Sequence, residues 1–201
     1  NTEPVLDNPP LVEQALTHAR ATGRVRLLIS GALSKDLASE SMPEFASMVE
    51  AGASVFSQPE GPVTDPGLFR RILLYVRGLV PFVAVQPHQP ELSADGLMHE
   101  GIASTVYGMR GIPAVAETVA VAREILLAAE TGCPVHLYQI STSAAVQLVA
   151  QAKAAGVPIS CDVGPHHLVL TVREGHDRSD GDRVTRVHAH GVEGLDRTDD
   201  D

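Results

Sequence analysis

Short apolar runs rich in β-branched residues alternate with segments of helical pattern along most of this chain. Five such runs are predicted to be strands, at residues 25–29, 53–56, 80–85, 134–140 and 157–163. We interpret these strands as apolar on both faces. Strands of that kind, alternating with helices, are typical of a parallel sheet that helices cover. The sequence therefore predicts an α/β fold.

Local capping signals mark the starts of the helices between these strands. The predicted starts are a capping box with Pro in the first turn at Ser41-Met42-Pro43-Glu44, an Asp-Pro pair at 65–66, Pro113, and Ser141 or Thr142. The helix from Asp65 carries apolar residues at helical spacing, and the helix from Pro113 is expected to reach about Ala129. Each helix follows a predicted strand, as β/α units require.

Two architectures fit this alternation equally well, a closed barrel and a doubly wound open sheet. The segments after the strands contain neither GxGxxG nor GxxxxGK[ST], the usual nucleotide-binding fingerprints. Their absence favours the barrel. A complete (β/α)₈ barrel typically needs about 250 residues, and this chain has 201. We therefore expect one domain that forms part of a barrel.

Composition excludes several classes of function. The net charge is -10, and no run of Lys or Arg reverses it locally, so a nucleic-acid partner is not expected. The two cysteines, Cys133 and Cys161, lack the spacing of a zinc ribbon or a disulfide framework. No apolar run is long enough to span a membrane. These features predict a cytoplasmic protein that does not bind membranes.

The composition changes abruptly near residue 171. Residues 172–201 contain five Arg, nine Asp or Glu, three His and a single Leu, with no strand or helix periodicity. We predict two regions, a partial barrel at 1–171 and a polar, disordered tail at 172–201.

Several motifs, in the same order, resemble those of dihydroorotases, members of the amidohydrolase superfamily. The segments are Asn1–Pro9 (NTxPVxDNP in the family), Gly31–Lys35 (GAxTKG), 51–57 (AGAxxFS), Met98–Gly101 with Gly111–Glu117 (MHEG and GIPxxAE), Ser141-Thr142 (the end of HxxHLST) and 165–171 (PHHLxLT). The resemblance spans residues 1 to about 171. It implies a (β/α)₈ barrel whose strands three to seven are the five strands predicted here. The segments that supply two metal ligands on strand one and the general base on strand eight are not in these residues.

The family's metal-ligand positions carry different residues in this chain. The Asp of FSDDG aligns with Pro59, or with Gln58 if the register shifts by one. The His after strand five falls at Gln86, and the second His of HxxHLST falls at Gln139. Zinc sites use imidazole, thiolate or carboxylate, whereas an amide is a weak ligand and the Pro side chain has no ligating atom. We therefore predict no metal ligands, no cofactor and no catalytic residues in this chain.

Two other histidines could rebuild a metal site. His88 lies two residues beyond Gln86, and His136 lies three before Gln139. The resemblance assigns His136 to the first His of HxxHLST, which is not a ligand in the family. We favour packing or hydrogen-bonding roles for both. Asn1 resembles the family's substrate-binding Asn and is the one substrate contact that the resemblance carries over.

The resemblance implies a function in pyrimidine biosynthesis. Active dihydroorotases use zinc to interconvert N-carbamoyl-L-aspartate and dihydroorotate. Homologues that have lost their metal ligands assemble with aspartate transcarbamoylase. The main hypothesis is therefore an inactive, structural partner of that enzyme, a pseudoenzyme. The alternatives are an active zinc cyclic amidohydrolase with a degenerate site, and an incomplete product with no independent role. Unpaired sheet edges also leave a homo-oligomer open.

Overall fold

A parallel five-stranded sheet forms the centre of the computed structural model, which describes residues 2–59, 61–165 and 167. The strands are β1 (Ile29–Ala32), β2 (Ala53–Gln58), β3 (Val83–Val85), β6 (Val135–Leu137) and β7 (Ile159–Cys161). They lie in the order β1-β2-β3-β6-β7, with every neighbouring pair parallel. This is the order that successive β/α units produce.

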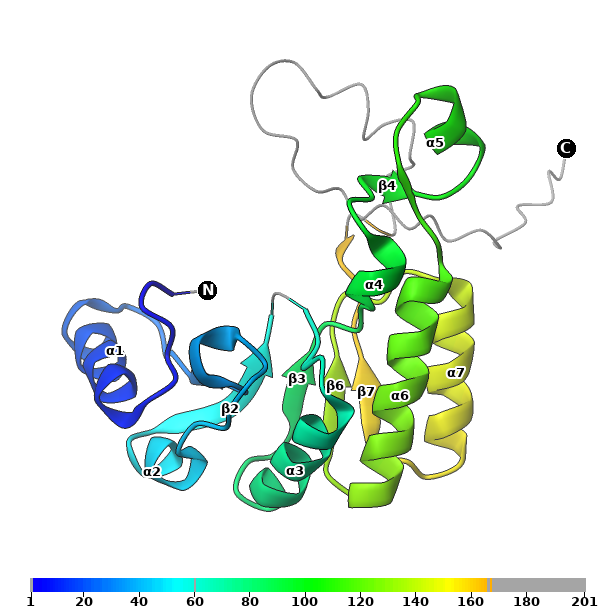
Figure 1. The fold of residues 1–201 in the computed structure, drawn as a ribbon. Coiled ribbons are helices and arrows are strands. Elements are labelled where there is room, and N and C mark those ends of the chain that lie inside the picture. The colour runs from blue at the N-terminus through cyan, green and yellow to red at the C-terminus, as the bar shows by residue number, and fades with distance from the viewer. Residues whose placement is uncertain (1, 60, 166, 168–201) are drawn as a thin grey trace, which may run out of the picture.

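The longer helices after the strands, α3 (Pro66–Val76), α6 (Val115–Thr131) and α7 (Ser143–Ala154), lie along one face of the sheet (Figure 1). The other helices are α1 (Pro9–Thr22), the short 3₁₀ turn η1 (Lys35–Leu37), α2 (Phe45–Glu50), α4 (Pro90–Ser93) and α5 (Ile102–Val106). Between β3 and α6 the chain makes an excursion that carries α4, α5 and a small parallel pair, β4 (Met98–His99) and β5 (Gly111–Ile112). In Figure 1, α5 projects away from the sheet.

The helix-covered face holds the hydrophobic core. Phe56 of β2 is fully buried and meets Phe45 of α2 edge to face, with ring centroids 4.7 Å apart. Val83 and Val135 follow Phe56 in the adjacent strands and are also buried. The core lacks Trp and depends on Val, Leu, Ile and three Phe side chains.

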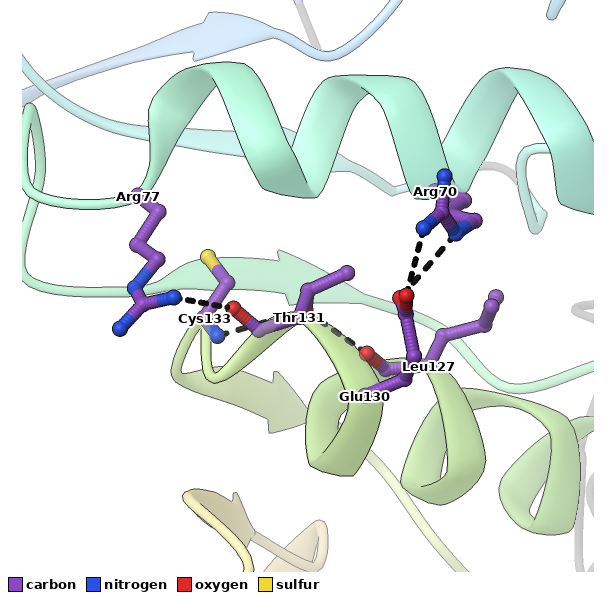
Figure 2. Close-up of polar contacts among 6 residues, drawn as sticks. All are labelled: Arg70, Arg77, Leu127, Glu130, Thr131 and Cys133. Atoms are coloured by element: carbon purple, nitrogen blue, oxygen red, sulfur yellow. Dashed lines mark hydrogen bonds and ion pairs between the residues drawn. The ribbon is translucent and has the colours of Figure 1, made fainter.

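Polar contacts join α3 to α6 at the rim of this core (Figure 2). The guanidinium of Arg70 donates two hydrogen bonds to Glu130, at 2.5 and 3.1 Å. Arg77 donates to the carbonyl of Thr131 at 2.9 Å, at the end of α6. Cationic donors at a helix C-terminus satisfy carbonyls that the helix leaves unpaired. Gly132 follows with a φ of 66°, the left-handed conformation that ends many helices.

The other face of the sheet carries polar residues among small and apolar ones, so the prediction of strands apolar on both faces is wrong. Ser57, Ala84, His136 and Ser160 are successive partners across β2, β3, β6 and β7, so their side chains share one face. Three of these four are half-buried. We call this the open face, and define it by Ser30, Ser57, His136, Tyr138, Ser160 and Asp162.

The first predicted strand is displaced. Residues 25–29 are apolar except for Arg26, but β1 begins only at Ile29, and Val25 and Leu28 are 79% and 61% exposed. Pairing with β2 starts at Ile29 and Ala53, so the preceding residues lie beyond the reach of the neighbouring strand. The other four strands fall within or next to their predicted ranges.

Two of the predicted caps are confirmed and one is wrong. The Asp65 side chain accepts a hydrogen bond from the N–H of Gly67, and Thr142 accepts one from Ala145. The Ser41 capping box does not form, because α2 begins at Phe45 and its cap residue is Glu44. The Ser41 carbonyl instead accepts from the N–H of Lys35.

Some predictions concern positions outside the described residues. They include Asn1 and the whole 172–201 tail, so the substrate-binding assignment of Asn1 and the disorder of the tail stay predictions. Within the described residues, no helix combines the length and hydropathy needed to cross a bilayer.

Candidate functional site at the carboxyl ends of the strands

Gln58 ends β2, where the family resemblance places a metal-binding Asp in one of two registers. Gln58 is 2% exposed, and both the oxygen and the nitrogen of its amide make hydrogen bonds. The amide oxygen accepts from Ser34 Oγ at 3.2 Å. The amide nitrogen donates to the Leu37 carbonyl at 2.8 Å and to Ser39 Oγ at 3.3 Å. These contacts tie Gln58 to the turn after β1 and satisfy both ends of its amide.

Pro59 occupies the other register and presents no ligand atom. It borders a largely apolar cavity of about 380 Å³ beside β1, which Leu27, Leu28 and Ser57 also line. In one register the end of β2 therefore presents the Gln58 amide, which is already hydrogen-bonded, and in the other it presents the Pro59 ring, which has no ligand atom.

The end of β3 carries Gln86, which is half-buried, and then His88. The Nε2 atom of His88 lies 2.7 Å from Ser93 Oγ, and Ser93 is buried in α4. His88 is thus hydrogen-bonded into the start of the excursion between β3 and α6. This contact shows that His88 makes a hydrogen bond, and the absence of a rebuilt metal site stays a prediction.

Gln139, two residues beyond β6, has an exposed side chain and a left-handed backbone with φ of 59°. This conformation is uncommon for a residue with a Cβ. The N–H of Gln139 donates to Asp162 Oδ1 at 2.7 Å, and the N–H of Ile140 donates to the Asp162 carbonyl at 3.1 Å. Asp162 therefore fixes the turn that leads from β6 into α7.

His136 lies on the open face and is hydrogen-bonded through both ring nitrogens. Its Nδ1 is 2.9 Å from Ser160 Oγ, and its Nε2 is 3.1 Å from Asp162 Oδ2. The ring of Phe82 packs beside it, with centroids 5.8 Å apart. The structure thus gives His136 a hydrogen-bond partner at each ring nitrogen, and its non-ligand role stays a prediction.

Glu117 of α6 clamps the start of α7. Its carboxylate is buried and accepts from the N–H and hydroxyl groups of both Ser141 and Thr142, at 2.5 to 3.1 Å. A carboxylate at a helix N-terminus also interacts favourably with the helix dipole. This contact positions the loop that follows Gln139.

Burial alters several ionisable groups around these strands. Burial raises the pKa of Tyr138 well above its usual range, while a hydrogen bond with Ser57 opposes the rise and Asp162 adds to it. Burial also raises the pKa of the Cys133 thiol to about 11, against the opposing charge of Arg77. Cys161 shifts in the same direction, mainly through burial. Both thiols are therefore poor nucleophiles and poor metal ligands at neutral pH.

The zinc that the resemblance implies does not fit the residues at these strand ends. Over residues 2–59, 61–165 and 167, the side chains of His, Cys, Asp and Glu form no group of three or more that is placed to hold an ion. The residues nearest the family's ligand positions are engaged elsewhere, Gln58 with Ser34 and His136 with Ser160 and Asp162.

Ser160, Asp162 and Glu117 were not predicted from the sequence as site residues. The sequence does place His136 and Tyr138 two residues apart in one predicted strand, and Ser160 and Asp162 two residues apart in the next. Side chains two residues apart on a strand share a face. The cross-strand register that brings the pairs together is not visible in the sequence.

Comparison with known proteins identifies the family. A family model described as dihydro-orotase-like matches residues 1–145. The chain is 43% identical over 171 residues to the dihydroorotase of Pelotomaculum thermopropionicum and 37% identical over 174 residues to that of Pelobacter propionicus. Each alignment covers 85% of this chain and 40% of the relative. The chain thus spans about two-fifths of the length of these relatives.

Solved structures show the same fold. An L-hydantoinase from Arthrobacter aurescens superposes with a TM-score of 0.69 at 20% identity, covering 86% of this chain and 40% of the hydantoinase. A D-hydantoinase from a Thermus species gives a TM-score of 0.60 at 18% identity, covering 82% and 38%. The five-stranded sheet is therefore part of a (β/α)₈ barrel of the amidohydrolase type, and the chain belongs to the dihydroorotase-like family.

Proposed function

We propose that this protein is a dihydroorotase-like component of pyrimidine biosynthesis that does not catalyse the zinc-dependent reaction and instead serves as a structural partner of aspartate transcarbamoylase. The role in pyrimidine biosynthesis follows from its similarity to curated dihydroorotases. The loss of catalysis and the choice of partner go beyond that similarity.

One observation carries the proposed loss of catalysis, the hydrogen bonding of Gln58. Its amide is buried and bonded to Ser34, Ser39 and the Leu37 carbonyl. To turn toward a metal ion, Gln58 would have to give up its hydrogen bonds to Ser34, Ser39 and the Leu37 carbonyl. Ser34 would still accept from the N–H of Ser39, and Ser39 would still donate to the Pro62 carbonyl, so the Leu37 carbonyl is the group that loses its donor. A polar group left buried without a partner costs about 1–3 kcal/mol. The hydrogen bonding of Gln58 therefore supports the proposal that the end of β2 does not bind metal.

The other two positions support the same proposal. Gln86 and Gln139 carry neutral amides where the resemblance implies imidazoles. The backbone at Gln139 is fixed by Asp162, which holds the residue in its left-handed conformation with the side chain exposed. Three separate strand ends thus lack the donor types that zinc prefers.

An exposed apolar surface supports a partner role. Ile102 and Val106 of α5 are 86% and 73% exposed, and they are four residues apart, so they lie on the same side of the helix. Exposed Leu97 lies just before β4 in the same excursion. Apolar residues gathered on a protrusion are typical of protein-protein contacts. The identity of the partner rests on the family resemblance.

The alternative is an active zinc dihydroorotase. Its support is the 43% identity to a curated dihydroorotase, a level at which chemistry is often retained. In that case the metal ligands would come from residues other than Gln58, Pro59, Gln86 and Gln139.

Two assays separate the proposals. The purified chain, supplied with zinc, is tested for dihydroorotate formation from N-carbamoyl-L-aspartate, and it is co-chromatographed with aspartate transcarbamoylase. We expect no turnover and a stable complex. The Ile102→Asp/Val106→Asp variant should weaken that complex, whereas Leu126→Asp, which alters an exposed residue of α6, should not. Zinc-dependent turnover would refute the proposed loss of catalysis, and failure to co-elute would refute the proposed partner.

A further inference from the structure

Ser160, His136 and Asp162 form a hydrogen-bonded row on the open face that the metal chemistry of the family does not use. His136 and Ser160 are register partners in β6 and β7. Asp162 lies two residues after Ser160, so its side chain returns to the same face. The distances are 2.9 Å from Ser160 Oγ to His136 Nδ1 and 3.1 Å from His136 Nε2 to Asp162 Oδ2.

The chemistry of these groups fixes the direction of the hydrogen bonds. An ionised carboxylate only accepts, so the Nε2 of His136 carries the hydrogen that faces Asp162. In a neutral imidazole the other nitrogen is then an acceptor. The hydroxyl of Ser160 consequently donates to Nδ1. This is the arrangement in which an imidazole acts as general base toward a serine hydroxyl, with a carboxylate holding its tautomer.

Part of this row is exposed in the structure. The side chains of His136 and Asp162 are 24% and 52% exposed, and Ser160 is half-buried. Phe82 packs against the His136 ring and helps to hold its orientation. Asp162 is further anchored because its Oδ1 accepts the N–H of Gln139. The three residues are thus held in a fixed arrangement.

We propose that Ser160 is a nucleophile, activated by His136 and Asp162, that accepts acyl groups from small carboxylic esters. The Ser160 oxygen attacks the ester carbonyl, and its proton passes to His136 Nδ1. The new bond joins Ser160 Oγ to the acyl carbon, and the bond to the alcohol oxygen breaks. The alcohol leaves with the proton from His136. Water then attacks the acyl carbon and gives a proton to His136 Nδ1. The bond from Ser160 Oγ to the acyl carbon breaks, Ser160 takes the proton back from His136, and the carboxylic acid leaves.

The test uses a fluorophosphonate, which reacts with activated serine hydroxyls. Ser160 Oγ forms a bond to phosphorus as fluoride leaves, and mass spectrometry of the digested full-length chain locates the adduct. Exposed Ser143, at the start of α7, is the internal reference for an unactivated serine. We expect Ser160 to react about 100-fold faster than Ser143, the lower end of what general-base assistance provides.

Three variants assign the role of each group. Ser160→Ala should abolish the adduct, and His136→Gln should reduce labelling to the Ser143 rate. Asp162→Asn keeps an oxygen for the Gln139 N–H but presents its NH₂ group to Nε2, which forces the proton onto Nδ1 and removes the base. Ser57→Ala alters a residue of the open face that makes no bond to Ser160, His136 or Asp162 among those described, so it should leave labelling of Ser160 unchanged.

The outcome does not depend on zinc or on aspartate transcarbamoylase, so it is separable from the proposed function. Circular dichroism establishes that each variant is folded, and Asp162→Asn provides a decisive test if His136→Gln does not fold. Labelling of Ser160 at the Ser143 rate in the folded wild type would overturn the proposal. Full labelling retained in folded Asp162→Asn would also overturn it.

Discussion

Phe56 and Ser57 are neighbours in β2, yet Phe56 is fully buried beneath the helices and Ser57 is half-exposed on the open face. The same contrast recurs in β6, where Val135 and Leu137 are buried and His136 between them is not. One face of the sheet therefore holds the fold together. The other face carries the polar groups of the open face. We expect substitutions there to lower the free energy of unfolding less than substitutions on the helix-covered face.

The largest difference between the faces should appear in β2. Phe56→Ala removes a fully buried ring that packs on Phe45, so we expect a loss of about 3–5 kcal/mol in the free energy of unfolding. Ser57→Ala removes the hydrogen bonds to Ser30 and Tyr138 on the open face, which should cost about 1–2 kcal/mol. Urea unfolding followed by circular dichroism measures both. Equal losses would contradict the division between the faces.

Glu117 tests whether a buried polar group can matter as much as a core side chain. Glu117→Ala leaves the backbone N–H groups of Ser141 and Thr142 without their acceptor, and we expect a loss of about 2–4 kcal/mol. Thr118→Ala on the same helix is the matched control, since its hydroxyl bonds only to the Ala114 carbonyl. Urea unfolding of the two variants should rank them clearly. A loss of unfolding free energy no larger than that of Thr118→Ala would show that the hydrogen bonds of Glu117 to Ser141 and Thr142 contribute little to stability.

Glu124 makes the helix-covered side sensitive to pH. Burial raises the pKa of its carboxyl from 4.5 to about 7, although Arg123 opposes the rise. Between these two values the folded state holds a proton that the unfolded chain has released. Stability should therefore fall as pH rises from about 5 to 7, by an amount on the order of 2 kcal/mol, and change little above that range.

Unfolding free energies at pH 5 and pH 8 measure this dependence. Glu124→Gln cannot release a proton, so its stability should vary less between the two conditions. Glu130→Gln is the matched control, because Glu130 lies on the same helix but is about half exposed and paired with Arg70. A wild-type slope that persists in Glu124→Gln would assign the pH dependence to another group.

The smallest expected effect lies at the rim of the core shown in Figure 2. Arg77→Ala removes the donor to the Thr131 carbonyl and should cost about 1 kcal/mol. Arg71→Ala is the control, since Arg71 reaches Asp65 only at 4.0 Å with both side chains exposed. Thermal unfolding should separate the two variants. If Arg71→Ala is the more damaging, the end of α6 does not depend on Arg77.

The sequence was sufficient to predict the β/α order, four of the five strands and the caps at Asp65 and Thr142, because periodicity and capping are local properties. It misplaced the first strand, since Val25, Leu27 and Leu28 are apolar but have no strand beside them in the described structure. It also missed the polarity of the open face. Ser57, His136 and Ser160 sit within otherwise apolar runs, and only the cross-strand register shows that they share a face.

The candidate site was predicted in part. The positions of Pro59, Gln86 and Gln139 at strand ends follow from the motifs. The hydrogen bonds that hold Gln58 come from a turn more than 18 residues earlier in the chain, and Asp162 reaches Gln139 from 23 residues away. Contacts over such separations depend on tertiary structure, so local patterns do not reveal them.

The zinc content of the purified chain tests the central claim most directly. The protein is equilibrated with excess zinc, desalted and measured by elemental analysis, with an active dihydroorotase treated in parallel. Because the strand ends present Pro59 and amide side chains, we predict substoichiometric zinc that is unchanged in Gln86→Ala and Gln139→Ala. Stoichiometric zinc that is lost in either variant would contradict the account.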